Sequence, residues 1–240
     1  MSNTSYNDIA GWYDAYLREN PLYREVVLPN VLALVGDVRE QYICDLACGQ
    51  GWIARELTQR GARVTGIDLA ENLLAIARQH EQQAPLGINY THGDAHHAHE
   101  LPDGDFDGCI CVMALMNLDD IPAVFQTVYR ILKPGGWFVF AITHPCFQTP
   151  GAQWITMPVG KTARVVSDYF TECIWASDSP GGVRSRVGEH HRMLSTYLNA
   201  LVAAGFVFEQ IVEPVGSGES SNQKPGRQEV PIILLVRSHR

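Results

Sequence analysis

The strongest constraint on this chain is a repeated alternation of short apolar runs with helical patterns. Apolar runs at 42–48, 63–69 and 106–115 are each followed by an amphipathic stretch, and a fourth run occupies 137–142. Runs that are apolar on both faces are typical of parallel strands that helices cover on both sides. The alternation therefore predicts an α/β fold built on a doubly wound, mostly parallel sheet.

The alternation stops after His144. Residues 145–189 carry Pro, Gly and aromatic residues without a clean period, which predicts an inserted cap. A helical pattern at 189–206 precedes strand-like runs at 206–215 and 230–239, which predict an antiparallel C-terminal hairpin. We expect one domain over 1–240, made of an N-terminal helical lid (1–40), a core (41–144), the cap (145–189) and a last helix with the closing hairpin (190–240).

Composition narrows the class of partner. The formal net charge is −8, so the basic stripe that a nucleic-acid partner requires is missing. The first residues do not form a secretory leader, and no apolar run approaches the about 20 residues that span a bilayer. We expect a cytoplasmic protein that acts on a small molecule and binds neither nucleic acid nor a membrane.

The stretch YICDLACGQGW, residues 42–52, carries two cysteines next to a pair of glycines. Three residues separate Cys44 from Cys48, whereas a thiol pair that binds metal or cycles between redox states usually has two. Free cysteine in a strand usually packs as a small apolar side chain. We therefore interpret both cysteines as packing residues.

The same stretch places Asp45 at a strand end and Gly49 and Gly51 at the start of a helix, while Asp68 ends the next strand. Glycines let the backbone approach a ligand, and a helix start offers N–H groups to an anion. A carboxylate at the second strand end is suited to the hydroxyls of a ribose. The pattern predicts a loop that binds a nucleoside cofactor.

Asp45 separates two cofactor classes. In a nicotinamide dinucleotide the group over this turn is a pyrophosphate, which a nearby carboxylate would repel. S-adenosylmethionine carries an ammonium and a sulphonium, so Asp45 can hold this cationic end. The N–H groups at the helix start can bind the carboxylate of the cofactor's methionine part. The pattern favours S-adenosylmethionine.

Five stretches also occur in the order typical of one known family. They are ICDLACGQG, GIDLAEN, HGDA, FDGCICVMALMNL and RILKPGGWFVFAI, within residues 40–144. They resemble the class I S-adenosylmethionine-dependent methyltransferases, in the ubiquinone-biosynthesis-like small-molecule branch. The resemblance implies a Rossmann-like, seven-stranded sheet and methyl transfer from S-adenosyl-L-methionine, by in-line displacement, to an oxygen or nitrogen of a small-molecule acceptor.

The resemblance also implies, position by position, which residues contact the cofactor. Asp45 holds the cationic end and Asp68 the ribose diol. The other members of the set are Ala47, Gly49 and Gly51 at the methionine end, Leu69, Asp94 and Ala95 around the adenine, and Val112 and Met113 at the far wall.

The stretch SYNDIAGWYDAYL resembles the helical lid of this family. Tyr6 and Tyr13 are seven residues apart, so one helix face can carry both over the cofactor, where an aromatic ring favours a sulphonium. We predict a cofactor contact for Tyr13, the alternative being an aromatic pair that only packs in the core.

The acceptor is expected beyond the carboxyl end of the fifth strand. His144 ends that strand, and with His190 and His191 it is a candidate catalytic base, the alternative being a helix cap or a surface group. Aromatic residues of the cap are expected to form the acceptor pocket or the cap's own small core: Phe147, Trp154, Tyr169, Phe170 and Trp175. Four arginines in or beside the cap are interpreted as solvated: Arg164, Arg184, Arg186 and Arg192.

The histidine-rich run at 92–99 has a composition that can bind metal, but it lacks the spacing of an H-E-x-x-H site. We interpret it as a solvated loop and expect no metal. Two rival functions stay open, a non-catalytic protein that binds S-adenosylmethionine or S-adenosylhomocysteine and a nicotinamide-dependent oxidoreductase.

Overall fold

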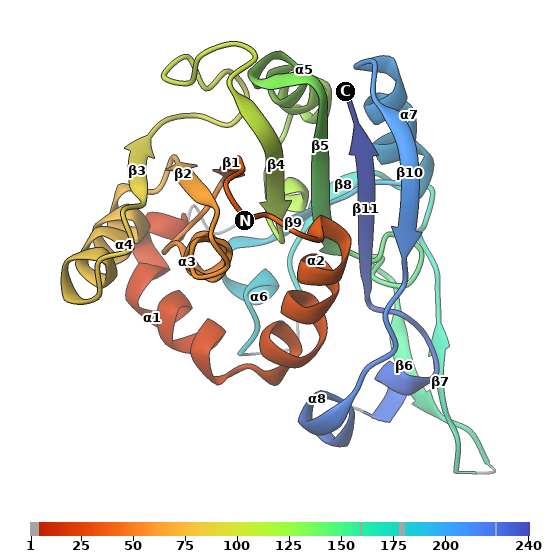
Figure 1. The fold of residues 1–240 in the computed structure, drawn as a ribbon. Coiled ribbons are helices and arrows are strands. Elements are labelled where there is room, and N and C mark those ends of the chain that lie inside the picture. The colour runs from red at the N-terminus through yellow and green to blue at the C-terminus, as the bar shows by residue number, and fades with distance from the viewer. Residues whose placement is uncertain (1–4, 159, 178–180, 224) are drawn as a thin grey trace.

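The computed structural model describes residues 5–158, 160–177, 181–223 and 225–240. The core is a seven-stranded sheet in the order β10-β11-β5-β4-β1-β2-β3, seen in Figure 1. Its strands are β1 (Tyr42–Leu46), β2 (Arg63–Asp68), β3 (Asn89–His92), β4 (Phe106–Val112), β5 (Leu132–Thr143), β10 (Val207–Val212) and β11 (Ile233–His239). Strands β1 to β5 pair in parallel, while β11 is antiparallel to both β5 and β10. The predicted α/β sheet with a C-terminal antiparallel hairpin is confirmed.

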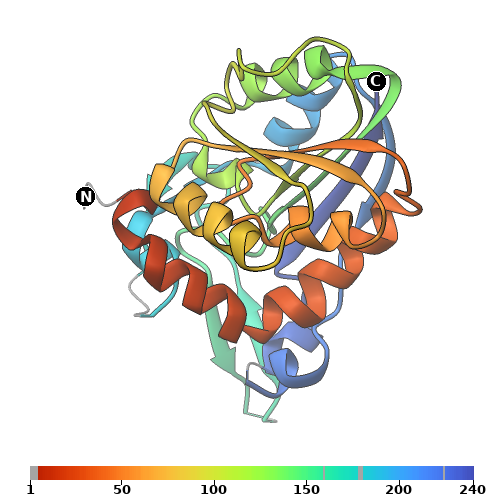
Figure 2. The same ribbon diagram turned by 60° about the vertical axis from the view of Figure 1, so that its left-hand side comes forward.

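Helices cover both faces of this sheet. Figure 2 shows α5 and α7 on one face and α2, α3 and α4 on the other. These helices are α2 (Leu28–Val35), α3 (Trp52–Thr58), α4 (Glu71–Gln83), α5 (Ile121–Ile131) and α7 (Leu194–Ala203). The chain turns from one face to the other between the neighbouring strands β1 and β4, as in a doubly wound fold. Among the described residues, no helix is long and apolar enough to cross a bilayer.

The sheet is buried on both faces, which explains the unbroken apolar runs of its strands. The aromatic rings of Phe138 and Phe140 on β5 pack against Phe125 of α5. Cys44 and Cys109 are fully buried and pair in register on β1 and β4. They occupy core positions, as the sequence predicts.

The N-terminal segment begins with α1 (Tyr6–Glu19), which packs against α4. Two hydrogen bonds fix this contact, because Asn72 donates from its backbone N–H to Asn7 Oδ1 and from its side-chain amide to the Asn7 carbonyl, each at 2.9 Å. A π-helix, η1 (Tyr23–Val27), then leads into α2. The first helix is therefore held over the carboxyl ends of the central strands.

The segment predicted as a cap forms two small antiparallel sheets. One pairs β6 (Gln153–Thr156) with β7 (Thr162–Val165), and the other pairs β8 (Cys173–Trp175) with β9 (Glu189–His191). Figure 1 shows the β6–β7 hairpin extending away from the main sheet. The short elements that complete the chain are α6 (Arg184–Val187), α8 (Gly218–Gln223), η2 (Leu115–Asn117) and η3 (Pro225–Gln228).

Gly51 shapes the loop between β1 and α3. Its φ is 78°, in the left-handed region that favours glycine. A Cβ atom at this position would lie 2.1 Å from Tyr90 Oη. Gly51 therefore serves close packing between the loop and β3.

Replacing Gly51 with alanine should lower the free energy of unfolding by about 2–5 kcal/mol, because the left-handed backbone and the clash with Tyr90 both oppose a Cβ. Chemical denaturation measures the difference. Gly87→Ala is the matched control, since Gly87 has a φ of 84° and no neighbouring atom within 4 Å of the Cβ position. The control should lose only about 1–2 kcal/mol, and equal losses at the two positions would contradict the clash.

Candidate functional site

A cavity of about 880 Å³ lies at the carboxyl ends of the parallel strands. Asp45 reaches it from β1, Asp68 from β2 and Val112 from β4, where the strand order reverses. Ligands of open α/β sheets bind at such a switch point. The predicted cofactor residues that line the cavity are Tyr13, Asp45, Ala47, Gly49, Asp68, Leu69, Asp94, Ala95, Val112 and Met113. Gly51 is not among the lining residues.

The Asp68 carboxylate links the glycine loop to the end of β2. Its Oδ2 accepts a hydrogen bond from the Gly49 N–H at 2.7 Å, and its Oδ1 accepts one from the Ala70 N–H at 2.7 Å. Burial raises the pKa of Asp68, and these backbone bonds oppose the rise. A carboxylate oxygen can accept more than one hydrogen bond, so both oxygens can still accept from a diol.

Asp45 is a buried acid without a basic partner. Its side chain is 2% exposed, and its Oδ2 accepts from the Ala54 N–H at 3.1 Å. Burial, together with the negative charge of Asp68, raises the pKa of Asp45 to about 8, while the bond from Ala54 opposes the rise. Among the described residues no Lys, Arg or His side chain forms an ion pair with Asp45. A cationic ligand group at this point would therefore restore its charge.

Two cavity residues hold a backbone conformation that non-glycine residues rarely adopt. Ala47 has a φ of 56° and Met113 a φ of 58°, and they follow the ends of β1 and β4. The Met113 N–H is held by a 2.7 Å bond to the Ala141 carbonyl. Backbone strain of this kind gathers at ligand sites, because the surrounding structure has to enforce it.

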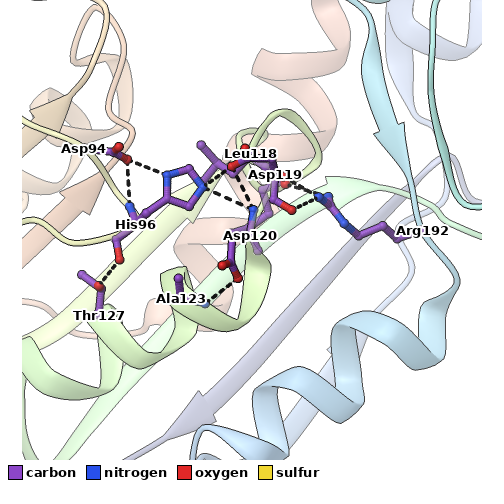
Figure 3. Close-up of polar contacts among 9 residues, drawn as sticks. Asp94, His96, Leu118, Asp119, Asp120, Ala123, Thr127 and Arg192 are labelled. Atoms are coloured by element: carbon purple, nitrogen blue, oxygen red, sulfur yellow. Dashed lines mark hydrogen bonds and ion pairs between the residues drawn. The ribbon is translucent and has the colours of Figure 1, made fainter.

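The part of the cavity lining that follows β2 and β3 in the sequence combines an apolar surface with a carboxylate. Leu69 lines the cavity with 59% of its surface exposed, which leaves a large apolar face for a flat ring. Asp94 Oδ1 lies 2.6 Å from His96 Nδ1, and His96 Nε2 lies 2.8 Å from Asp119 Oδ1, as Figure 3 shows. Burial raises the pKa of Asp94, but the bonds from His96 outweigh it and leave the pKa below its usual value. Asp94 is thus an ionised acceptor whose other oxygen, Oδ2, makes no described bond.

The loop that carries Asp119 is held from two sides. Arg192 donates to the Leu118 carbonyl and, at 2.8 Å, to the Asp119 carbonyl. Asp120 caps α5 by accepting from the Ala123 N–H at 3.0 Å. These bonds fix the position of the loop, which lines the cavity beside His96.

The lid contributes three tyrosines to the cavity wall. The rings of Tyr6 and Tyr13 meet edge to face at 5.2 Å, and the hydroxyls of Tyr13 and Tyr23 are hydrogen bonded. Burial is the main cause that raises the pKa of all three phenols, so they stay neutral. Sequence reasoning missed Tyr23, because Pro21 separates it from α1 and no helical spacing connects it with Tyr13.

Of the three candidate histidines, only His190 lines the cavity. His144 is 1% exposed, and its Nε2 lies 2.6 Å from Glu213 Oε1 while its Nδ1 accepts from the Cys146 N–H. His191 is buried with its Nε2 2.8 Å from the Tyr169 carbonyl. The position of a residue in a strand does not fix the direction of its ring. The His144 ring turns to Glu213 and the His191 ring to the Tyr169 carbonyl, so the structure brings neither to the cavity.

The five aromatic residues of the cap that were expected at the acceptor pocket also lie outside the cavity lining. The Phe147 ring packs against His144, and Phe170 is 83% exposed. Tyr169 Oη accepts from the Leu194 N–H at 3.0 Å. Trp175 lies under Arg184, and its neighbour on β8, Ile174, lines the cavity instead because successive side chains of a strand point to opposite faces. The alternative interpretation, packing within the cap, describes these contacts better.

Glu189 is the cavity residue that sequence reasoning most clearly missed. It is 6% exposed, its Oε1 lies 2.7 Å from Arg184 Nε, and it shares a hydrogen bond with Thr143. Burial raises its pKa against the charge of Arg184. The available signal was its position next to His190 at the end of the cap. Other missed residues of the lining are Trp52, Asn117 and Leu118.

Comparison with known proteins agrees with this geometry. Residues 44–140 match a family described as "Methyltransferase domain". A "Ubiquinone biosynthesis O-methyltransferase" of Pseudomonas aeruginosa is 31% identical over 144 residues, a match that spans 57% of this chain and only 62% of that relative.

Solved structures cover more of the chain. An S-adenosylmethionine-dependent methyltransferase from Mesorhizobium loti is 33% identical and superposes with a TM-score of 0.76 over 88% of this chain and 96% of that one. A SAM-dependent methyltransferase from Aquifex aeolicus, 14% identical, has a TM-score of 0.62 over 92% of this chain and 94% of its own, and shows the shared fold alone.

Asp45→Asn should stabilise the ligand-free protein relative to the native one, and increasingly so as the pH rises from about 5 to about 8. A carboxyl whose folded pKa is raised to about 8 contributes stability below its ordinary pKa of 3.8 and loses it as the pH rises through the folded value. Thermal unfolding across this range measures the effect.

Asp37→Asn is the control for this experiment, because ion pairing with Arg39 lowers the pKa of Asp37 to about 2 and leaves it ionised throughout. Its difference from the native protein should stay constant over the range. A constant difference for Asp45→Asn as well would show that Asp45 is ionised in the folded protein.

Proposed function

This chain belongs to the S-adenosylmethionine-dependent methyltransferases, and from this premise we propose that it transfers the methyl group of S-adenosylmethionine to an oxygen or nitrogen of a small molecule. The observation that carries the proposal is one shared cavity that Asp45, Asp68 and Asp94 all line. The Pseudomonas aeruginosa relative is named an O-methyltransferase, which favours oxygen. The net charge of −8 supports a small-molecule acceptor over a nucleic acid. We place this activity in the cytoplasm.

The residues present fit the cofactor at each of its polar ends. Asp45, which has no basic partner, is suited to an ammonium, and Asp68 offers oxygens to two ribose hydroxyls. The exposed face of Leu69 fits the adenine ring, and Asp94 Oδ2 can accept from its amine. When bound, S-adenosylmethionine supplies a methyl group on a positively charged sulphur, which is a good leaving group.

The protein's own residues then have three tasks. The rings of Tyr6 and Tyr13 exclude water and present aromatic faces that favour a sulphonium. The walls orient the acceptor opposite the sulphur, and such positioning contributes about 7–11 kcal/mol in well-oriented reactions. An acceptor that took the methyl group would have a proton to lose, which a base in the cavity lining would accept.

His190 is suited to accept that proton. Burial and the positive charge of Arg192 lower its pKa, which outweighs the charge of Asp119, so the imidazole is neutral and has a nitrogen available as a base. The rival functions are less well supported. The pyrophosphate of a nicotinamide dinucleotide would bring no cation to pair with Asp45, and a non-catalytic binder has no need of His190 in the lining.

Asp68→Ala should weaken the binding of S-adenosylmethionine and S-adenosylhomocysteine by about 2–4 kcal/mol, because two hydrogen bonds to a charged group and one tie to the glycine loop are lost. Isothermal titration calorimetry measures this change, with NAD as the unrelated ligand. Asp103→Ala is the control, since that side chain is 75% exposed and pairs with Arg130, away from the cavity lining. If a folded Asp68→Ala protein kept native affinity, Asp68 would have no role in binding the ribose.

His190→Gln should reduce methyl transfer by about 100-fold or more while the affinity for S-adenosylhomocysteine changes less than about twofold, because only the proton acceptor is removed. Release of S-adenosylhomocysteine in the presence of phenol and amine acceptors measures turnover. His144→Gln is the matched histidine variant, since His144 faces Glu213 and not the cavity. The reverse pattern, with loss only in His144→Gln, would return the role of base to His144.

A further inference from the structure

Two arginines of the cap, Arg164 and Arg184, share one hydrogen-bond acceptor, and the charges of Arg227 and Arg184 both act on the hydroxyl of Tyr16; we name these three residues the arginine subsite. Arg164 Nη2 and Arg184 Nη1 each lie 3.4 Å from the same neutral acceptor, Gln148 Oε1. Arg227 is 8% exposed, and its Nη1 donates to Ser220 Oγ at 2.6 Å. The three come from β7, α6 and η3, which are far apart in sequence.

The subsite holds more positive charge than the protein neutralises. Arg184 pairs with Glu189 at 2.7 Å, but within the described parts of the chain no carboxylate lies within 4.0 Å of the Arg164 or Arg227 guanidinium. The buried Nε of Arg227 has no hydrogen-bond partner there either. A buried cation without an anion is costly, and a net charge of −8 shows that this chain does not lack acidic residues.

The acid–base equilibria of these residues reflect the uncompensated charge. Burial, and then the neighbouring positive charge of Arg184, lower the pKa of Arg164 to about 10. Burial also lowers the pKa of Arg227. Both shifts mean that the protein disfavours these cations as they stand, so an anion that bound here would relieve the cost.

Aromatic faces hold two of the guanidiniums in place. Arg164 lies over the Trp154 ring at 4.8 Å and Arg184 over the Trp175 ring at 4.4 Å. Stacking leaves the edge of a guanidinium open to acceptors. Arg164 Nε donates to the Phe147 carbonyl at 2.9 Å, and its other N–H groups can bind a carboxylate or phosphate. This arrangement also gives Trp154 and Trp175 a role other than direct contact with the acceptor.

The subsite adjoins the cavity at the end where the acceptor is expected. Arg184 contacts Glu189, which lines the cavity and shares a hydrogen bond with Thr143 at the end of β5. The charges of Arg227 and Arg184 also act on the hydroxyl of Tyr16, whose ring lies 6.2 Å from that of the cavity residue Tyr23. Arg184 is thus one side chain removed from the cavity, directly behind the lining residue Glu189.

We propose that the arginine subsite binds an oxyanion, a carboxylate or a phosphate, carried by the methyl acceptor. The inference rests on the proposed function, since it names the chemical class of the acceptor. Arg184 binds the oxyanion next to Glu189. Arg164 and Arg227 supply the positive charge that offsets the negative charges of the Glu189 carboxylate and of the bound oxyanion. Neutral acceptors of the same shape bind less tightly, because they leave this charge uncompensated.

Calorimetric and ligand-observed NMR titrations of the full chain, with and without saturating S-adenosylhomocysteine, test the proposal. The probes are benzoate and inorganic phosphate, with benzamide as the neutral match for benzoate. We expect at least one anion to bind about tenfold or more tightly than benzamide, and Arg184→Gln and Arg164→Gln each to weaken that binding by about tenfold or more. Arg184→Gln leaves the buried Glu189 without its partner and could fail to fold. Arg164→Gln leaves no described carboxylate unpaired, so it keeps the proposal testable.

Arg186→Gln is the matched control, because Arg186 lies on the same short helix but is exposed and stacks over Trp12. It should keep native anion affinity. Binding of benzoate alone would identify a carboxylate, and binding of phosphate alone a phosphate group. Equal binding of benzoate and benzamide, no anion binding, or equal loss in Arg186→Gln would each overturn the proposal. Failure of S-adenosylhomocysteine to bind would instead overturn the proposed function and leave the anion result readable.

Discussion

The site depends on one carboxylate. Asp68, at the end of β2, accepts hydrogen bonds from the N–H groups of Gly49 and Ala70. These bonds hold the glycine loop after β1 against the start of α4, so that three acidic residues face one space. Without them one buried N–H in the loop and one at the start of α4 would have to be satisfied elsewhere, and the cavity wall would lose its shape.

Charge is distributed unequally along the cavity. Asp45, Asp68 and Asp94 lie along the strand ends, whereas the arginine subsite lies behind Glu189. Burial raises the pKa of both Asp45 and Asp68 and lowers that of Arg164, so each end carries charge that the protein alone leaves partly uncompensated. A cationic cofactor at one end and an anionic acceptor at the other would offset both costs.

Residues placed by their own strand were predicted correctly, whereas residues placed by contacts with distant parts of the chain were not. Asp45, Asp68 and the strands that carry them follow from apolar periodicity and from the place of each acid at a strand end. His144 also ends a strand, but its ring turns toward Glu213, which is 69 residues away in sequence. Tyr23 and Glu189 were missed, since they reach the cavity through an irregular helix and a short strand of the cap.

The sequence by itself determined the doubly wound sheet, its closing hairpin and the strand ends that line the cavity, because burial imposes local periods that can be read residue by residue. Only the tertiary structure decided which histidine faces the cavity, that the cap tryptophans pack against arginines, and that Arg164 and Arg184 meet at Gln148. These features depend on side-chain directions and on contacts between distant segments, which no local pattern specifies.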